Sequence, residues 1–230
     1  MWILNAIKSG DVLQLVTGLA VRLLIIFFVL PIHECAHGWA AQKLGDNTAK
    51  AQGRLTLNPV AHIDPFGALF LILFGFGWAK PVPINPYNFK NHKSGMALTA
   101  LAGPASNLLV ALLGAVIYNA CIVFLPAAFF ATVGYQILYY FFSWLILINI
   151  SLAVFNLIPI PPLDGSRIFN AILPEKWSYQ IARYERYIFI GLAVLIFSGV
   201  LDPVLSFLNQ YALQGVFWIA DLPFKLFGLL

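Results

Sequence analysis

Two histidines and a glutamate stand close together in the sequence as His33, Glu34 and His37. Residues four positions apart lie on the same face of a helix, so both imidazoles can reach one metal ion. The glutamate beside the first histidine can then approach a water molecule at that ion. This H-E-x-x-H pattern is typical of metal-assisted peptide hydrolysis with the glutamate as base.

These groups lie in an apolar segment, residues 23–44, which has the length of a membrane-spanning helix. Histidine and glutamate are unfavourable inside a membrane and indicate a functional site by default. The alternative is a pair of histidines that are hydrogen-bonded between helices without a metal. That arrangement would leave three buried polar groups without a suitable partner, so we favour the metal site.

The composition supports a membrane protein. Hydrophobic residues make up 61% of the 230-residue chain and charged residues 10%, whereas a soluble domain averages about 25% charged residues. A water-soluble enzyme and a disordered chain are therefore excluded. The net charge is +4, but the basic residues flank apolar segments, as membrane topology requires, so we predict no nucleic-acid partner.

We expect an all-α polytopic membrane protein with about 4–6 membrane helices. The expected spans cover residues 23–44, 96–125, 131–158 and 188–201. Residues 66–78 are apolar but too short to span, which predicts a re-entrant segment. Residues 204–220 are compatible with either an interfacial helix or a last membrane span.

Two segments suggest a short membrane-associated β-hairpin or strand region. Residues 54–57 alternate polar and apolar side chains, and residues 79–89 contain three prolines that exclude a helix. The strand-like residues 51–60 and 80–86 could offer an edge that pairs with an extended substrate. Alternatively, these segments only shape the cavity.

The basic residues predict the orientation in the cell membrane. Ten of the 13 lysines and arginines lie in residues 43–93 and 167–186, and residues 121–131 contain none. The positive-inside rule places both basic segments in the cytoplasm, with the active site toward that face. We treat residues 1–230 as one intramembrane metalloprotease domain, with an interfacial lead-in (1–22), a catalytic membrane core (23–201) and a C-terminal apolar segment (202–230).

A catalytic zinc ion usually has three protein ligands, so a third ligand is needed. Asp164 is favoured because it follows an apolar span inside a rigid proline-rich loop, although an aspartate before a glycine is also a common turn residue. The spacing alone leaves both interpretations open. The carboxylates considered are Asp46, Asp64, Asp164, Glu175, Glu185 and Asp202.

The pair HECAH (33–37) and NLIPIPPLDG (156–165) resembles the motifs of the site-2 proteases, which are intramembrane zinc metalloproteases. The segments GRLTLNPVAHIDPFG, GWAKPVPINP and AGPASN are also similar to the compact bacterial and archaeal members without PDZ or CBS domains. The resemblance covers roughly residues 23–200. It implies one Zn²⁺ per chain held by His33, His37 and Asp164.

The resemblance further implies that Glu34 activates a zinc-bound water and that Asn156 is a catalytic residue lining the site. From the residues alone, Asn156 could equally be a polar contact between helices. The implied activity is a zinc-dependent endopeptidase that cleaves in or near the transmembrane segments of single-span membrane proteins, as in regulated intramembrane proteolysis. The implied partners are these substrates and the lipid bilayer, and the oligomeric state is open.

Two other classes of function would also use buried polar residues in a membrane protein. A metal or proton transporter also contains buried histidine and aspartate, but it would be expected to show inverted repeats, which the sequence lacks. A non-catalytic, zinc-stabilised membrane scaffold would lack the base, and Glu34 is present. Among other polar residues, we expect His62 at the surface, Asn107 bound to backbone groups freed at Pro104, and Cys35 in packing.

Overall fold

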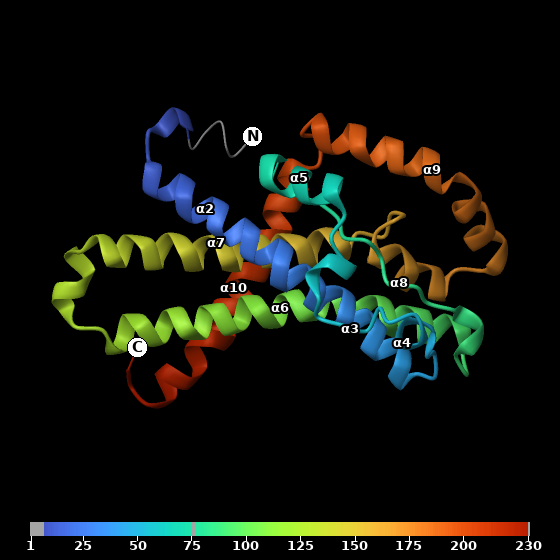
Figure 1. The fold of residues 1–230 in the computed structure, drawn as a ribbon, viewed down its shortest axis with the longest axis horizontal. Helices are drawn as coiled ribbons and strands as arrows, with labels where there is room; N and C mark the ends of the chain where they lie inside the picture. Colours follow the sequence, from blue (N-terminus) through green and yellow to red (C-terminus); the bar gives the residue numbers. More distant parts are fainter. Residues whose placement is uncertain (1–6, 75–76, 230) are drawn as a thin grey trace.

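The computed structural model describes residues 7–74 and 77–229. The helices are α2 (Val12–Leu24), α3 (Leu30–Lys43), α4 (Thr48–Ala51), α5 (Pro65–Phe74), α6 (His92–Phe124), α7 (Val133–Asn156), α8 (Asp164–Ile172), α9 (Glu175–Phe197) and α10 (Asp202–Leu226). Single turns of other helix types are η1 (Ile25–Val29), η2 (Pro59–Ala61), η3 (Pro86–Asn88) and η4 (Ala127–Ala131). The long helices α6 and α7 lie side by side, and the short helices α4 and α8 lie near one end of this pair (Figure 1).

The first membrane-spanning helix is longer than the sequence predicts. Helices α2 and α3 run on through the π-helical turn η1 as one helix, Val12–Lys43. Its start at Val12 is possible because Arg22 finds partners inside the protein. The guanidinium donates to the Gly18 carbonyl at 3.0 Å and lies 4.8 Å from the centre of the Trp144 ring. A buried, partnered arginine therefore does not end the helix.

Helices α6 and α7 form an antiparallel pair, and α10 crosses both of them (Figure 1). The crossing is lined by small residues, including Ala111, Ala115 and Ala220, all fully buried. Small residues let helix backbones approach closely, which is how membrane helices commonly pack. Helix α3 packs on α6 at the end where α4 and α8 lie, so the HExxH segment faces both α6 and α8.

The number of spans is smaller than predicted. Within the described residues, three helices are long and apolar enough to cross a membrane, or up to four if α9 and α10 count as one bent span. These two helices meet at 83°, next to Gly199, whose φ of 73° ends α9. The expectation of 4–6 spans is corrected accordingly. Residues 204–220 lie inside α10, which packs on α6 and α7.

The predicted β-hairpin was wrong. The described part of the chain contains no strand, and an isolated antiparallel bridge joins Ile63 to Ala79. Pro81 and Pro83 have no amide hydrogen to donate to a ladder. The Lys80 N–H donates to the His62 carbonyl within this bridge, but the Val82 N–H donates to the Glu34 carboxylate and not to a neighbouring strand. Residues 54–57 have no regular structure and lie between α4, after which Gly53 has a φ of 65°, and η2.

Candidate metal centre

Three potential metal ligands converge where α3 meets the start of α8. The two Nε2 atoms of His33 and His37 are 3.1 Å apart, and they lie 3.3 Å and 3.2 Å from Asp164 Oδ2. Both histidines are buried, and the Asp164 side chain is 14% exposed. No other group of three His, Cys, Asp or Glu side chains in the described residues is close enough to share an ion.

The spacing of these atoms fits zinc. Tetrahedral zinc with bonds of about 2.0–2.1 Å has neighbouring ligand atoms about 3.3 Å apart. The three distances match three edges of such a tetrahedron. The fourth corner is then free for water or substrate, as in catalytic zinc sites.

The hydrogen bonds of the two imidazoles also favour a cation. His37 Nδ1 donates to the Thr99 carbonyl at 2.7 Å, and His33 Nδ1 lies 2.6 Å from Asn107 Oδ1. A neutral imidazole that donates through Nδ1 has a lone pair on Nε2. Two lone pairs and a carboxylate therefore face one another. An extra proton would satisfy one of these contacts, whereas one cation at their centre satisfies all three.

Helix α6 supplies a continuous face against the imidazoles. Thr99, Gly103 and Asn107 are spaced four residues apart and so lie on one side of the helix. All three residues are buried. The sequence predicts that Asn107 binds backbone groups freed at Pro104, whereas its side chain contacts His33 and Asn149. Its position four residues after Gly103, in a helix expected beside the HExxH segment, is the signal that could have found it.

Helix α8 places Asp164 through its own first turn. Asp164 is the first residue of the helix, directly after the loop that contains Pro159, Pro161 and Pro162. Gly165 packs tightly against the end of α7, where an added Cβ would lie 2.2 Å from the Leu157 carbonyl oxygen. Glycine is therefore required next to the carboxylate, in addition to any role in the turn.

Glu34 is buried next to the two histidines. Its Oε2 accepts a hydrogen bond from the Val82 backbone N–H at 2.9 Å. This bond joins the carboxylate to the extended, proline-rich segment that follows α5. The segment predicted as an edge strand thus donates an amide to Glu34.

Asp46, one of the carboxylates considered as a third ligand, has a different role. It lies just after α3 and accepts hydrogen bonds from the Thr48 hydroxyl, the Asn88 side chain and the backbone amides of Asn85 and Thr48. Burial raises the pKa of the Asp46 carboxyl, but these hydrogen bonds outweigh it and hold the pKa below its ordinary value. Asp46 therefore anchors residues 85–88 to the end of α3.

Three other polar residues were singled out in the sequence: Asn156, His62 and Cys35. Asn156 is the last residue of α7, and its half-buried side chain makes no hydrogen bond within the described part of the chain. His62 is not at the surface: it is fully buried, with Nε2 2.7 Å from the Thr56 carbonyl. The same carbonyl accepts from Cys35 Sγ at 2.7 Å, which fits a packing role for the thiol.

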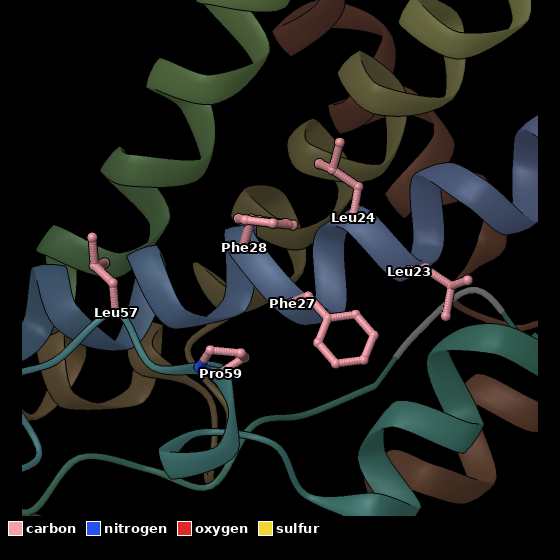
Figure 2. A pocket seen from close by; sticks show the side chains of 6 residues that line it. All are labelled: Leu23, Leu24, Phe27, Phe28, Leu57 and Pro59. Carbon is pink, nitrogen blue, oxygen red and sulfur yellow. The ribbon is translucent and has the colours of Figure 1, made fainter.

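An apolar groove of about 520 Å³ lies beside the first span (Figure 2). It contains none of the candidate ligands. Its lining is Leu23, Leu24, Phe27, Phe28, Leu57 and Pro59. Such a surface suits apolar contacts and adds no chemistry to the metal centre.

The apolar helices and the three-residue cluster fit a membrane metallopeptidase. The family model "Peptidase family M50" matches residues 127–198. A Bacillus subtilis (strain 168) protein named as a candidate zinc metalloprotease, YwhC, is 42% identical over 201 residues, which are 84% of this chain and 88% of the relative. The chain belongs to peptidase family M50, the site-2 protease family.

More distant relatives are also named as zinc metalloproteases. Rip2 of Mycobacterium tuberculosis (strain ATCC 25618 / H37Rv), also named as a candidate zinc metalloprotease, is 25% identical over 93% of this chain and 79% of its own length. The zinc metalloprotease MJ0392 of Methanocaldococcus jannaschii is 27% identical over 70% of this chain and 36% of its own length. No solved structure is significantly similar to the chain. The protein is thus a multi-pass membrane metalloendopeptidase with zinc as its cofactor.

Proposed function

We propose that this protease hydrolyses peptide bonds in or near the transmembrane segments of single-span membrane proteins, with zinc held by His33, His37 and Asp164. The observation that carries the proposal is the group of three ligand atoms 3.1–3.3 Å apart, with Glu34 beside them on the same helix. Residues 1–230 act as one domain in this proposal.

The chemistry follows from the residues around the ion. When bound, zinc supplies a Lewis acid that polarises the scissile carbonyl and makes water a better nucleophile. Glu34 accepts a proton from the attacking water as the water oxygen bonds to the carbonyl carbon. When the carbon–nitrogen bond breaks, Glu34 returns that proton to the leaving amine. The Val82 amide holds the Glu34 carboxylate in place for both transfers.

We assign Asn156 the role of a hydrogen-bond donor to the substrate carbonyl. It lies seven residues after Asn149 on α7, so the two asparagines share a face of that helix. Asn149 is in turn bonded to Asn107, the partner of His33. An uncommitted amide on this face is suited to bind a peptide group.

The basic residues near the metal centre indicate how the protein is oriented in the membrane. Lys43 ends α3 and Lys50 lies in α4. Lys90 and Lys93 flank the start of α6, and Arg167 lies about one turn after Asp164. Because cytoplasmic ends are rich in lysine and arginine, we place the metal centre toward the cytoplasmic face. Substrates would then be cut near the cytoplasmic ends of their spans.

The test is Glu34→Gln in cells that co-express a library of epitope-tagged single-span membrane proteins. We expect cleavage to fall by about 10²–10⁴-fold, the usual contribution of a general base. Zinc content, measured by elemental analysis of the purified protein, should stay at one ion per chain. The matched control is Glu185→Gln, which makes the same change on the exposed part of α9 and should cleave normally.

Two outcomes would contradict the proposal. Undiminished cleavage by the Glu34→Gln variant would show that Glu34 is not the general base. Full zinc content in a chain with His33, His37 and Asp164 all replaced by alanine would place the metal elsewhere.

A further inference from the structure

Three buried groups connect α7 through α6 to the first candidate zinc ligand. Asn107 Oδ1 lies 2.6 Å from His33 Nδ1, and Asn107 Nδ2 lies 3.5 Å from Asn149 Oδ1. Both asparagines are fully buried. We propose that Asn107 and Asn149 are positioning residues that fix the tautomer and the ring orientation of His33. This inference rests on the proposed function, because it takes His33 as a zinc ligand.

A backbone carbonyl sets the direction of every hydrogen bond in this series. Asn149 Nδ2 lies 2.8 Å from the Leu145 carbonyl oxygen, and a carbonyl oxygen can only accept. The Asn149 NH₂ group is therefore the donor there, which leaves its Oδ1 to face Asn107. The Asn107 NH₂ group must then donate to Asn149, and its Oδ1 faces His33.

The tautomer of His33 follows. Opposite an oxygen that can only accept, His33 Nδ1 must carry the proton. The lone pair is then on Nε2, which points toward His37 Nε2 and Asp164 Oδ2. The inverted amide would offer an N–H to Nδ1 and move the lone pair to the wrong side of the ring. The Leu145 carbonyl on α7 thus determines which nitrogen of a residue on α3 can bind zinc.

His37 reaches the same tautomer by a different route. Its Nδ1 donates to the backbone carbonyl of Thr99, which cannot be inverted. His33 depends on a side-chain amide, which can rotate by 180° unless its NH₂ group is committed. Asn149 Oδ1 accepts the hydrogen bond from the Asn107 NH₂ group and so prevents this rotation. We therefore expect His33 to be the more sensitive of the two ligands to substitution of its partner.

The experiment measures zinc affinity of the full-length protein in detergent micelles by competition with a chelator. Asn107→Leu removes the acceptor at similar size and should weaken zinc binding by about 10–100-fold, as for other partners of metal-bound histidines. Asn107→Asp keeps the oxygen that faces His33 but places a second oxygen against Asn149 Oδ1, so its zinc affinity should lie between that of Asn107→Leu and that of the original chain. Asn149→Leu frees the Asn107 amide to rotate and should have an intermediate effect.

The matched control is Asn119→Leu on the same helix. Asn119 is also buried, but it donates to Asp221 on α10 at 2.9 Å, far along α6 from the histidines. Its loss should lower the midpoint of thermal unfolding and leave zinc affinity unchanged. A merely structural role of Asn107 would give the same pattern as this control.

A second measurement uses the original chain. The sequence contains four histidines, so ¹⁵N labelling of histidine gives a spectrum of four rings. We expect the His33 ring to carry its proton on Nδ1 before zinc is added, and His33→Ala identifies its signals. This measurement decides the inference even if Asn107→Leu does not fold.

The inference is overturned if Asn107→Leu binds zinc as tightly as the original chain, if Asn107→Asp is as weak as Asn107→Leu, or if the His33 proton is on Nε2. Failure of the proposed function looks different, because His33→Ala would then retain zinc. Loss of zinc in His33→Ala with no change in Asn107→Leu would refute the positioning role alone.

Discussion

Gly103 on α6 lies directly against the two imidazoles of α3. A Cβ on Gly103 would be 2.3 Å from His37 Nε2 and 2.6 Å from His33 Cε1, much closer than carbon and nitrogen atoms can approach. The affected nitrogen is one of the three candidate ligand atoms. The absence of a side chain at this position therefore allows α6 to support the metal centre.

We predict that Gly103→Ala displaces the His37 ring and weakens zinc binding by at least about 10-fold, because tuned metal sites respond strongly to ligand orientation. The matched control is Gly114→Ala on the same helix. An added Cβ there meets its nearest neighbours, side chains of α7, at 3.4 Å, which they can accommodate. In a helix this change can even stabilise by about 0.5–1 kcal/mol. Equal zinc affinity in both variants, measured by chelator competition, would refute the prediction.

Gly165→Ala should act on the third ligand. The added Cβ would lie 2.2 Å from the Leu157 carbonyl oxygen, so the start of α8 must move away from α7. Asp164 moves with it. We predict loss of zinc comparable to that of Asp164→Ala, as measured by elemental analysis after dialysis. Retention of a full zinc ion by Gly165→Ala would show that the loop can adjust without moving the carboxylate.

The sequence predicted which candidate ligands lie together better than it predicted the residues around them. The HExxH spacing places His33 and His37 on one helical face whatever the rest of the fold, and the structure brings Asp164 to them. The partner of His33 could not be predicted in this way. Asn107 is 74 residues away, and its contact depends on how α6 packs on α3.

The prediction of a β-hairpin was wrong for a related reason. Alternation of polar and apolar residues indicates strands only if neighbouring amides are free to pair. Here prolines remove some donors, and Glu34 and Asp46 bind the Val82 and Asn85 amides. Likewise, the first span starts at Val12 and not at residue 23, because the contact of Arg22 with Trp144 on α7 lets the helix include this arginine. Tertiary contacts decided each of these cases.

Removal of the ion should destabilise the fold as well as stop catalysis. Without a cation, two imidazole lone pairs and the Asp164 carboxylate face one another at 3.1–3.3 Å. A ligand that binds the folded state alone adds about 2.7 kcal/mol at 100 times its dissociation constant. We therefore predict that a chelator lowers the midpoint of thermal unfolding and that Zn²⁺ restores it. Restoration by Mg²⁺, which prefers oxygen ligands, would contradict the site.

Asp46 should make the segment beside Glu34 sensitive to acid. Its pKa is lower in the folded protein than the ordinary value, so its stabilisation is complete above about pH 4 and decreases as the pH falls toward the folded pKa. We predict that Asp46→Asn unfolds more easily at pH 7, by about 1.5–3 kcal/mol, the usual contribution of hydrogen bonds to a charged group.

The difference between Asp46→Asn and the original chain should shrink as the pH is lowered through this range, because both then carry a neutral group. Thermal unfolding at a series of pH values measures it. Asp202→Asn changes an exposed carboxylate and serves as the control. A difference that grows toward low pH would mean that the sign of the pKa shift is wrong.

Substitution of Asn156 distinguishes most clearly between a residue that supports the metal and a residue that binds the substrate. Its amide makes no hydrogen bond to the three candidate ligands in the described structure, so Asn156→Leu should leave zinc affinity unchanged. If the amide donates to the substrate carbonyl as charge develops there, cleavage should fall by about 10²–10³-fold, as for other donors of this kind. Asn107→Leu should show the opposite order, with zinc lost first. A variant of Asn156 that loses zinc but cleaves normally once zinc is in excess would make it a support of the metal centre and not a contact of the substrate.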